Sequence, residues 1–368
     1  MRLYLLDKFV CPRCGHFPLD FEVKSWGEAT SFATHKRPCE RYCGFERNLL
    51  NTDEQPPCSK CLSQQVLTGT LSCSQCGDTY PVIDGIPHLL IEHGGEKSKK
   101  WVEEERAWWD RRYAKLSHTV RILRQHKAEG VPGNRDSERY HYLFKLLKDR
   151  LKSSLIVEIG AGTSRYVASL LPPAEHSYFY IGTDISLQGL YLGRRLMPEG
   201  DFVLCAAGAM PFRDGVADVV LSLGVLHHIP DWKTSLPRLL DLLKDGGLFV
   251  FDEAIEKPRI LGRFRKQSLT AAIDSPHEGE VVLEEMLRIM QEKGEVWFVH
   301  TKTTPVRVLL VFLFGRLMEH SVGLTKLVLG IDQWVLKTMG KLWASFGPGE
   351  ALGIFERGRE VAQDSPRP

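Results

Sequence analysis

The chain has 368 residues, of which 43% are apolar and 26% charged, a composition typical of a soluble globular protein with a full α/β domain and a smaller module. Its formal net charge is only +2, so a nucleic-acid partner is compatible with the sequence but not favoured. No apolar run reaches the ~18 residues of a membrane span, and the run in the opening M-R-L-Y-L-L-D-K is too short for a signal peptide, so we expect a cytoplasmic protein.

The first feature along the chain is a set of eight cysteines before residue 77. They form four close pairs: Cys11/Cys14, Cys39/Cys43, Cys58/Cys61 and Cys73/Cys76. A short turn holds two thiolates on one side, and two such turns complete a tetrahedron around zinc. In a cytosolic protein, zinc binding is favoured over disulfides. We therefore expect zinc in this region.

Two arrangements of these pairs are open. The one we favour joins Cys58/Cys61 to Cys73/Cys76, because their separation by residues 62–72 is typical of a compact zinc ribbon. In that case Cys11/Cys14 and Cys39/Cys43 remain for a second site. The alternative is nested: Cys11/Cys14 joins Cys73/Cys76, and Cys39/Cys43 joins Cys58/Cys61.

The two ends of this region resemble a known family. L-L-D-K-F-V-C-P-R-C-G (5–15) and L-S-C-S-Q-C-G-D-T-Y-P-V-I-D-G-I-P-H-L-L (71–90) are similar to the ends of the small zinc-ribbon proteins that activate tRNA, rRNA and protein methyltransferases. The resemblance implies a zinc-ribbon module at residues 1–92. Because a ribbon has no pocket of its own, we expect it to pack against an enzyme or to dock a substrate.

Residues 93–136 are expected to be a linker and a helical cap. The polar segment E-H-G-G-E-K-S-K-K (92–100) is typical of a linker, and W-V-E-E-E-R-A-W-W-D-R-R-Y-A (101–114) has charges and aromatics at helical spacing. Its Trp108, Trp109 and Tyr113 either cover a ligand site or pack against the main domain.

Residues 137–358 are expected to form that main domain. An amphipathic helix at 137–151 leads into alternating strands and helices, the pattern of a parallel, doubly wound α/β sheet. A helix is expected at 279–293, and strands are expected at 155–159, 179–183, 218–223, 247–253, 295–301 and 351–356.

A glycine turn after the first strand predicts a nucleotide site. Gly160 and Gly162 would let a ligand approach the backbone, and Asp184 ends the next strand, where a carboxylate can accept hydrogen bonds from two ribose hydroxyls. A dinucleotide turn needs a third glycine where this chain has Arg165. Glu158 would repel a pyrophosphate but suits a cation. These residues favour S-adenosylmethionine, which carries an ammonium, a sulfonium and an adenosine.

The same region resembles the class I S-adenosylmethionine-dependent methyltransferases. The matching motifs are V-E-I-G-A-G-T-S (157–164), T-D-I-S (183–186), A-M-P-F-R-D-G-V-A-D-V-V (209–220), L-G-V-L-H-H-I-P-D (223–231) and L-K-D-G-G-L-F-V-F (243–251). The resemblance implies a Rossmann-like, seven-stranded sheet. It also implies a cofactor site at Glu158, Gly160, Gly162, Asp184, Ala206, Ala207 and Leu223.

Ala217 replaces a phenylalanine that is usual in this family, and two further departures concern the cofactor site. Ser164 stands where a third glycine is usual, and it either tightens the turn or adds a hydroxyl contact. Ala206 stands where many members have an aspartate that contacts the adenine amino group. In this chain that contact would come from the backbone at Ala206 and Ala207.

Two histidines follow the strand expected at 218–223, on the side where a methyl acceptor would lie. His228 is our candidate general base, needed if the acceptor is a hydroxyl or a protonated amine, and His227 is the second candidate. Alternatively both order the loop. His277 and Glu278 are further candidates on the acceptor side.

The segment 305–345 is an apolar and basic helical insertion, and 359–368 is expected to be a disordered tail. The insertion could contact a membrane surface, roof an acceptor, form a homodimer or pack on the sheet. The predicted function is methyl transfer to a small or lipid-like acceptor. The alternatives are an RNA or protein methyltransferase that docks its substrate through the ribbon, and an inactive cofactor-binding scaffold.

Overall fold

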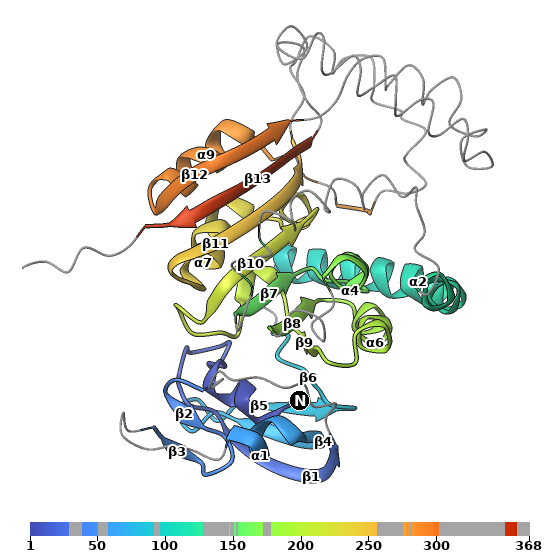
Figure 1. The fold of residues 1–368 in the computed structure, drawn as a ribbon, viewed down its shortest axis with the longest axis vertical. Helices are drawn as coiled ribbons and strands as arrows, with labels where there is room; N and C mark the ends of the chain where they lie inside the picture. The colour runs from blue at the N-terminus through green and yellow to red at the C-terminus, as the bar shows by residue number, and fades with distance from the viewer. Residues whose placement is uncertain are drawn as a thin grey trace, which may run out of the picture.

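The structure is a computed structural model that describes residues 1–28, 39–50, 58–91, 96–127, 147, 151, 154–171, 178–255, 275–277, 279, 281–301 and 350–358. Figure 1 shows two units in contact. The N-terminal module lies below a larger α/β domain, and the long helix α2 (Glu96–Lys127) crosses that domain. The predicted insertion at 305–345 and the tail at 359–368 lie outside the described residues, as does the helix at 137–151 apart from Leu147 and Leu151.

The main domain is built on a sheet of seven strands in the order β12-β13-β11-β10-β7-β8-β9. The five strands from β11 to β9 are parallel, and β13 runs antiparallel to both of its neighbours. The strands are β7 (Leu155–Ile159), β8 (Phe179–Asp184), β9 (Asp201–Leu204), β10 (Ala217–Leu223), β11 (Leu243–Ala254), β12 (Gly294–Thr301) and β13 (Glu350–Arg357). The predicted α/β methyltransferase fold is confirmed, although β9 was not among the expected strands.

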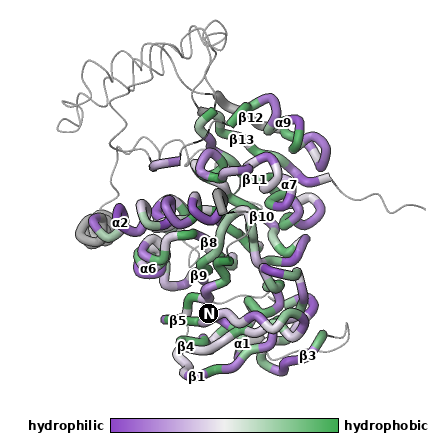
Figure 2. The backbone as a smooth tube through the Cα atoms, turned by 180° about the vertical axis from the view of Figure 1, so that it is seen from behind, coloured by the Kyte–Doolittle hydropathy of each residue, from purple (hydrophilic) through white to green (hydrophobic). Residues whose placement is uncertain are grey.

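Helices connect these strands as a doubly wound fold requires. They are α4 (Arg165–Leu170), α6 (Leu187–Leu196), α7 (Trp232–Asp241) and α9 (Leu283–Gln291), with short 3-10 turns η3 (Ala207–Ala209) and η4 (Leu226–His228). The last helix is shorter than the predicted 279–293, because Val281 is held in a β-bridge with Ile255. Figure 2 shows apolar residues concentrated on the central strands of the sheet.

The N-terminal module has its own antiparallel sheet in the order β1-β4-β5-β6 and a small hairpin of β2 and β3. Its elements are η1 (Leu3–Asp7), β1 (Asp20–Glu28), β2 (Tyr42–Cys43), β3 (Asn48–Leu49), α1 (Cys58–Ser63), β4 (Gln64–Ser72), β5 (Thr79–Ile83) and β6 (Ile86–Pro87). Strand β4 is long and pairs with β1 over most of its length. It therefore separates α1 from the turn at 73–76.

The module covers the edge strand of the main sheet. The segment after β6 runs parallel to β9, with a bridge between His88 and Leu204 and a hydrogen bond from the Leu89 N–H to the Leu204 carbonyl at 2.9 Å. Phe9 packs against Phe212 with ring centroids 5.5 Å apart. Buried apolar side chains of both units form one continuous cluster. The two units therefore share a hydrophobic core.

Buried charges also cross this junction. The Arg2 guanidinium pairs with Asp201 at 2.9 Å, and both side chains are almost fully buried. Arg213 pairs with Asp7 at 3.2 Å, again with both side chains buried. The Arg2 guanidinium lowers the pKa of the Asp201 carboxyl, which burial alone would raise. Buried ions of this kind are tolerated when each has its partner.

Helix α2 begins inside the segment predicted to be a linker and runs far beyond the expected 101–114. The helix is held against α6 within the expected 101–114 stretch. Asp110 on α2 accepts hydrogen bonds from the Ser186 hydroxyl at 2.6 Å and from the Gln188 N–H at 3.1 Å, at the start of α6. Tertiary packing therefore outweighs the low apolar content of this helix. Among the described helices, none has the length and apolar character needed to cross a membrane.

We expect Asp201→Ala to lower the free energy of unfolding by about 3–5 kcal/mol, because it removes the carboxylate that pairs with the buried Arg2 guanidinium. Chemical denaturation measures the change. Lys100→Ala is the control, since its pair with Glu104 is largely exposed and should contribute less than about 1 kcal/mol. Equal effects of the two substitutions would show that the junction does not depend on the buried pair.

Candidate active site and metal centre

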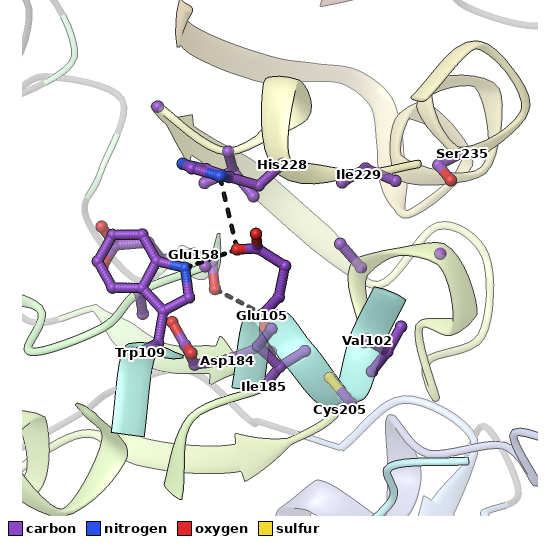
Figure 3. Close-up of a pocket in the computed structure, with 18 of the residues that line it drawn as sticks. Val102, Glu105, Trp109, Glu158, Asp184, Ile185, Cys205, His228, Ile229 and Ser235 are labelled. Carbon is purple, nitrogen blue, oxygen red and sulfur yellow. Dashed lines mark hydrogen bonds and ion pairs between the residues drawn. The ribbon is translucent and has the colours of Figure 1, made fainter. Parts of the chain in front are cut away.

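A cavity of about 560 Å³ lies beyond the carboxyl ends of β7, β8 and β10. This is where ligands bind in open α/β sheets. Figure 3 shows the side chains that converge on it, from the sheet on one side and from α2 on the other. The lining includes Glu158 and Asp184 from the predicted cofactor set, and Trp109, which was considered as a possible cover. It also includes Glu105, Cys205 and Ser235, which were not predicted.

The glycine turn is required by close packing. Gly160 and Gly162 both have positive φ angles, 60° and 51°, a region that other residues enter at a cost. A Cβ on Gly162 would overlap the hydroxyl of Tyr113 from α2, and a Cβ on Gly160 would lie 2.6 Å from Val225 Cγ2. Gly160 lines the cavity, whereas Gly162 lies beneath Tyr113. The two glycines therefore leave space for helix α2 as well as for a ligand.

Ser164 has a left-handed backbone, with φ at 53°, and this explains why a glycine is usual at this position. Its hydroxyl is hydrogen-bonded to the Tyr180 hydroxyl at 2.8 Å. Of the two alternatives raised by the sequence, the serine thus adds a hydroxyl contact. It supports Tyr180, whose hydroxyl also hydrogen-bonds to Glu158.

Glu158 is a buried carboxylate at the end of β7, and its first partner is the Tyr180 hydroxyl. Burial raises the pKa of Glu158 to about 8, and the hydrogen bond from Tyr180 opposes this only in part. The group therefore carries a proton at neutral pH until a cation enters the cavity. A carboxylate that gains its charge beside a cation suits the ammonium group of S-adenosylmethionine.

Asp184 ends β8 and ties together two parts of the site. One oxygen accepts a hydrogen bond from the Gly162 N–H at 2.7 Å, and the other accepts one from the Ser186 N–H at 2.7 Å. Burial raises the pKa of Asp184 to about 6, while these backbone N–H groups act in the opposite direction. Each carboxylate oxygen can accept a further hydrogen bond, so the pair can still receive a ribose diol.

Ala206, Ala207 and Leu223 line the cavity, as expected for the adenine end of the site. Gly208 lies beside Ser235 of α7, so close that a Cβ added to the glycine would lie 3.5 Å from the serine Oγ. Ser235 also lines the cavity. A hydroxyl from α7 thus lies next to the turn where the family's aspartate is absent, a contact that the sequence motifs did not indicate.

Helix α2 covers the opposite side of the cavity with Trp101, Glu105 and Trp109. Glu105 is buried and accepts hydrogen bonds from Trp109 Nε1 at 3.0 Å and from the backbone N–H of His277 at 3.0 Å. Trp101 stacks on the His277 ring at 4.4 Å. Of the three aromatic residues considered from the sequence, Trp109 and Tyr113 line the cavity, whereas Trp108 packs against Trp109. Glu105 was missed.

The two candidate histidines have different surroundings. His228 lines the cavity, with Nδ1 3.0 Å from the Ser275 hydroxyl and 3.7 Å from a Glu105 oxygen. Burial, with a smaller effect from His227, lowers the pKa of His228 to about 3, so its ring is neutral at physiological pH. His227 lies 3.0 Å from Glu253 through Nδ1. It is absent from the described lining, and Glu253 also accepts backbone N–H groups of the same loop.

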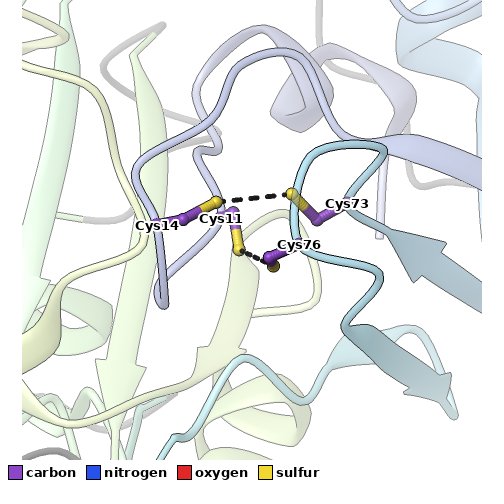
Figure 4. Close-up of side chains that lie close together, drawn as sticks. All are labelled: Cys11, Cys14, Cys73 and Cys76. Carbon is purple, nitrogen blue, oxygen red and sulfur yellow. Dashed lines mark hydrogen bonds between the residues drawn. The ribbon is translucent and has the colours of Figure 1, made fainter.

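Four cysteines form a cluster suited to zinc. The ligand atoms of Cys11, Cys14, Cys73 and Cys76 all lie within 4.8 Å of one another. Figure 4 shows the two turns facing each other, with Cys14 and Cys73 sulfurs 3.5 Å apart and Cys11 and Cys76 sulfurs 3.6 Å apart. Four thiolates at ~2.3 Å from a tetrahedral zinc ion are separated by ~3.8 Å, so this donor set fits the metal.

The favoured pairing of Cys58/Cys61 with Cys73/Cys76 is therefore wrong, and the nested alternative is correct for this cluster. Strand β4 supplies the reason. Cys61 precedes β4 and Cys73 follows it, and an extended strand of this length spans ~30 Å. Asp20 at the start of β1 pairs with Ser72 at the end of β4, which brings the turn containing Cys11 and Cys14 to Cys73.

Comparison with known protein families agrees with both parts of the chain. Residues 157–251 match the methyltransferase domain family, and residues 2–85 match the Trm112p-like protein family. The chain thus contains a region that matches a methyltransferase domain, preceded by a region that matches a Trm112p-like protein. The predicted class I methyltransferase fold, the cofactor S-adenosylmethionine and the zinc-binding module are confirmed by these matches together with the cysteine cluster.

Curated relatives resemble the methyltransferase part. Demethylmenaquinone methyltransferase of Renibacterium salmoninarum is 32% identical over 98 residues, covering 27% of this chain and 40% of that protein. Phthiotriol/phenolphthiotriol dimycocerosates methyltransferase of Mycobacterium tuberculosis is 33% identical over 103 residues, covering 27% and 37%. The chain thus spans about two-fifths of the length of these relatives.

Two solved structures have similar folds at low identity. The complex of the Haloferax volcanii Trm112 methyltransferase activator with a candidate methyltransferase has a TM-score of 0.40 and 15% identity, covering 70% of this chain and 98% of that chain. Phosphoethanolamine N-methyltransferase 2 of Haemonchus contortus, in complex with S-adenosyl-L-methionine, has a TM-score of 0.41 and 16% identity, covering 57% and 50%. Neither superposition bears on function.

The raised pKa of Glu158 predicts that S-adenosylmethionine binding releases a proton. Below pH 8 the free protein holds a proton on Glu158, and the cation requires the carboxylate, so affinity should fall as pH falls from 8. At pH 7 we expect release of about 0.9 proton per ligand. Calorimetry in two buffers of different ionisation enthalpy measures this number. Glu158→Gln should bind weakly with almost no proton release, and an unchanged release would assign the proton to another group.

Proposed function

We propose that this protein transfers a methyl group from S-adenosylmethionine to a small or lipid-like acceptor. The observation that supports the proposal most directly is the shared cavity. Buried carboxylates lie on its sheet side, and an apolar, aromatic wall with one neutral histidine faces them from α2 and the loop after β10. A cationic donor and an apolar acceptor could meet there with water excluded.

The cofactor end of this proposal rests on the side chains of the sheet. Glu158 would bind the methionyl ammonium, and Asp184 would accept hydrogen bonds from the ribose. Ala206, Ala207 and Leu223 would surround the adenine. Because Asp184 also holds the glycine turn through the Gly162 N–H, ribose binding and turn geometry are coupled.

The acceptor end is largely apolar. Ile91, Trp101, Val102, Trp109 and Ile229 contribute to its wall. Helix α2 lies over this end, which favours a small molecule or a narrow lipid chain over a folded macromolecule. The relatives named for demethylmenaquinone and for phthiotriol dimycocerosates, both lipid-related substrates, support the same class.

His228 is proposed as the general base for a hydroxyl acceptor. Its ring is neutral at physiological pH, the protonation state from which a general base acts, although burial that lowers its pKa to about 3 also makes it a weak base. The Glu105 carboxylate 3.7 Å from Nδ1 favours the tautomer with the proton on Nδ1, which leaves Nε2 as the acceptor atom. His227 is proposed to order the loop through Glu253.

A second candidate function is methylation of RNA or protein docked through the N-terminal module. The Trm112p-like match supports it, because the resemblance is to activators of such enzymes. A third is an inactive scaffold that binds the cofactor. Membrane contact or a homodimer through 305–345 stays a proposal, since that segment lies outside the described residues.

The experiment that separates these functions is incubation of cell extracts with the protein and a radiolabelled methyl donor, followed by fractionation. We expect label in the lipid or small-molecule fraction. Label in RNA or protein that falls steeply with salt would support docking through the module. Calorimetric binding of S-adenosylmethionine without label in any fraction would indicate a scaffold.

Asp184→Ala should weaken S-adenosylmethionine binding by about 100-fold, because charge-assisted hydrogen bonds to the ribose are lost and the Gly162 turn is released. Titration calorimetry measures the affinity, and a thermal melt monitors the fold. Asp214→Ala, at an exposed position of the same domain, is the control. Unchanged affinity in the Asp184 variant would refute the ribose assignment.

His228→Gln should lower kcat by about 10²–10⁴-fold and leave the affinity for S-adenosylmethionine unchanged. His227→Gln should instead lower the melting temperature, since it removes a contact to Glu253 that supports the loop. Steady-state kinetics with the identified acceptor, together with melting curves, provide the comparison. A kcat loss that appears only in the His227 variant would reverse the two roles.

A further inference from the structure

Three further cysteines meet at the other end of the N-terminal module. Cys39, Cys43 and Cys61 are each at most 2% exposed. Cys61 shares side-chain hydrogen bonds with both of the others. They belong to the loop before β2, to β2 itself and to α1, so three separate segments bring thiols to one point. Because the Cys61 thiol has two thiol partners, a single disulfide does not account for the arrangement.

The backbone around Cys43 repeats the turn found at the Cys11/Cys14/Cys73/Cys76 cluster. In that cluster, the Cys11 carbonyl accepts the Gly15 N–H at 2.8 Å, and the Cys73 carbonyl accepts the Gly77 N–H at 2.9 Å. Both glycines have positive φ, 74° and 78°. The Cys43 carbonyl likewise accepts the N–H of the residue four positions on, Arg47, at 2.7 Å.

Arg47 adopts this conformation although it is not a glycine. Its φ is 57°, a region that costs an arginine free energy, so the surrounding structure must require the turn. In addition, the Glu46 N–H lies 3.5 Å from the Cys43 sulfur and donates to it. Backbone N–H groups directed at sulfur stabilise a thiolate and are typical hydrogen-bond partners of a metal ligand. The turn also differs from the other two at the position of the second cysteine. Glu46 occupies that position, and Cys39 instead precedes the turn.

The chain has a fourth cysteine in the same helix as Cys61. Helix α1 begins at Cys58, and Cys61 follows one turn later. Residues three apart lie on the same face of a helix. The donor set would then be four cysteines, as in structural zinc sites.

We propose that Cys39, Cys43, Cys58 and Cys61 bind a second structural zinc ion. This site is separate from the cluster of Cys11, Cys14, Cys73 and Cys76, because the strand β4 lies between α1 and the turn at 73–76. It completes the nested arrangement of the four cysteine pairs.

The second site would hold the segment that joins the module to the methyltransferase domain. Between Cys39 and Cys43, the N–H groups of Arg41 and Tyr42 donate to the buried Asp7 carboxylate at 2.7 and 2.8 Å. Asp7 in turn pairs with Arg213 of the main domain. Both ends of this short segment would be fixed by the metal.

Glu40 extends this junction toward the sheet. Its carboxylate lies 3.4 Å from Arg213 and 2.8 Å from Lys244. Lys244 is 3.5 Å from Asp218, whose other oxygen accepts the Leu155 N–H at the start of β7. The zinc ion would therefore position a chain of polar contacts that reaches the strand carrying Glu158.

Zinc content of the purified full-length chain tests the proposal. We expect about two zinc ions per chain by elemental analysis, about one in Cys61→Ser, about one in Cys14→Ser and none in the double variant. Cys205→Ser is the matched control, since Cys205 is a buried cysteine of the main domain, and it should retain both. A single zinc ion in the native chain that is lost in Cys14→Ser and kept in Cys61→Ser would overturn the second site.

Cobalt provides a readout that does not depend on the variants folding. The metal-free native chain should take up about two equivalents of Co²⁺, each with the intense thiolate charge-transfer absorption of a tetrahedral site. Saturation at about one equivalent, or a disulfide among residues 39–61 in the mass spectrum of the metal-free chain, would contradict the proposal.

Hydrogen exchange tests the role of the metal at the junction. In Cys61→Ser, the amides of Arg41 and Tyr42 should exchange faster, because the segment between Cys39 and Cys43 loses its anchor. In Cys14→Ser these amides should keep their native protection. Equal protection in both variants would show that the junction is held without the second metal.

Discussion

The carboxylate of Asp184 is the contact on which the site depends. It joins the Gly162 turn to the start of α6 through two backbone N–H groups, and Ser186, which donates one of them, also binds Asp110 on α2. The turn, two helices and the end of β8 therefore meet at one buried charge. Tyr113 packs over Gly162 for the same reason, since α2 is held close to the turn. A site organised in this way is formed before any ligand enters.

Burying the carboxyl groups of Asp184 and Glu158 costs free energy of solvation. Both carboxyls have pKa values raised by burial, which means that the free protein holds them in a less favourable state than water would. In the proposed complex, a cationic ligand would relieve this cost at Glu158.

Much of the fold could be predicted from the sequence because buried parallel strands are nearly continuous apolar runs, as in L-I-V-E-I at β7. Strand β9 was not predicted because D-F-V-L is too short to stand out. The start of α2 was mistaken for a linker, because E-K-S-K-K (96–100) is entirely polar and follows two glycines.

The site was predictable to the extent that its motifs are local. Glu158 and Asp184 lie at the carboxyl ends of strands, so their place at the edge of the sheet follows from the alternation of strands and helices. Glu105 was hidden in a run of three glutamates that resembles a solvated helix face. The zinc pairing was misjudged because spacing alone suggests that residues 62–72 turn back, whereas they form a straight strand paired with β1.

Residues 88 and 89 cover the edge strand β9, and this cover bears on aggregation. An uncovered edge strand presents free N–H and C=O groups to any other strand and is a common start of aggregation. A separate subunit can protect such an edge only while it stays bound. That protection depends on how fast the subunit associates and on its concentration in the cell. Here the protecting segment is in the same polypeptide and is synthesised before the edge that it covers. In each chain, the β9 edge is therefore protected from pairing with another copy by residues of the same chain, as soon as the chain folds.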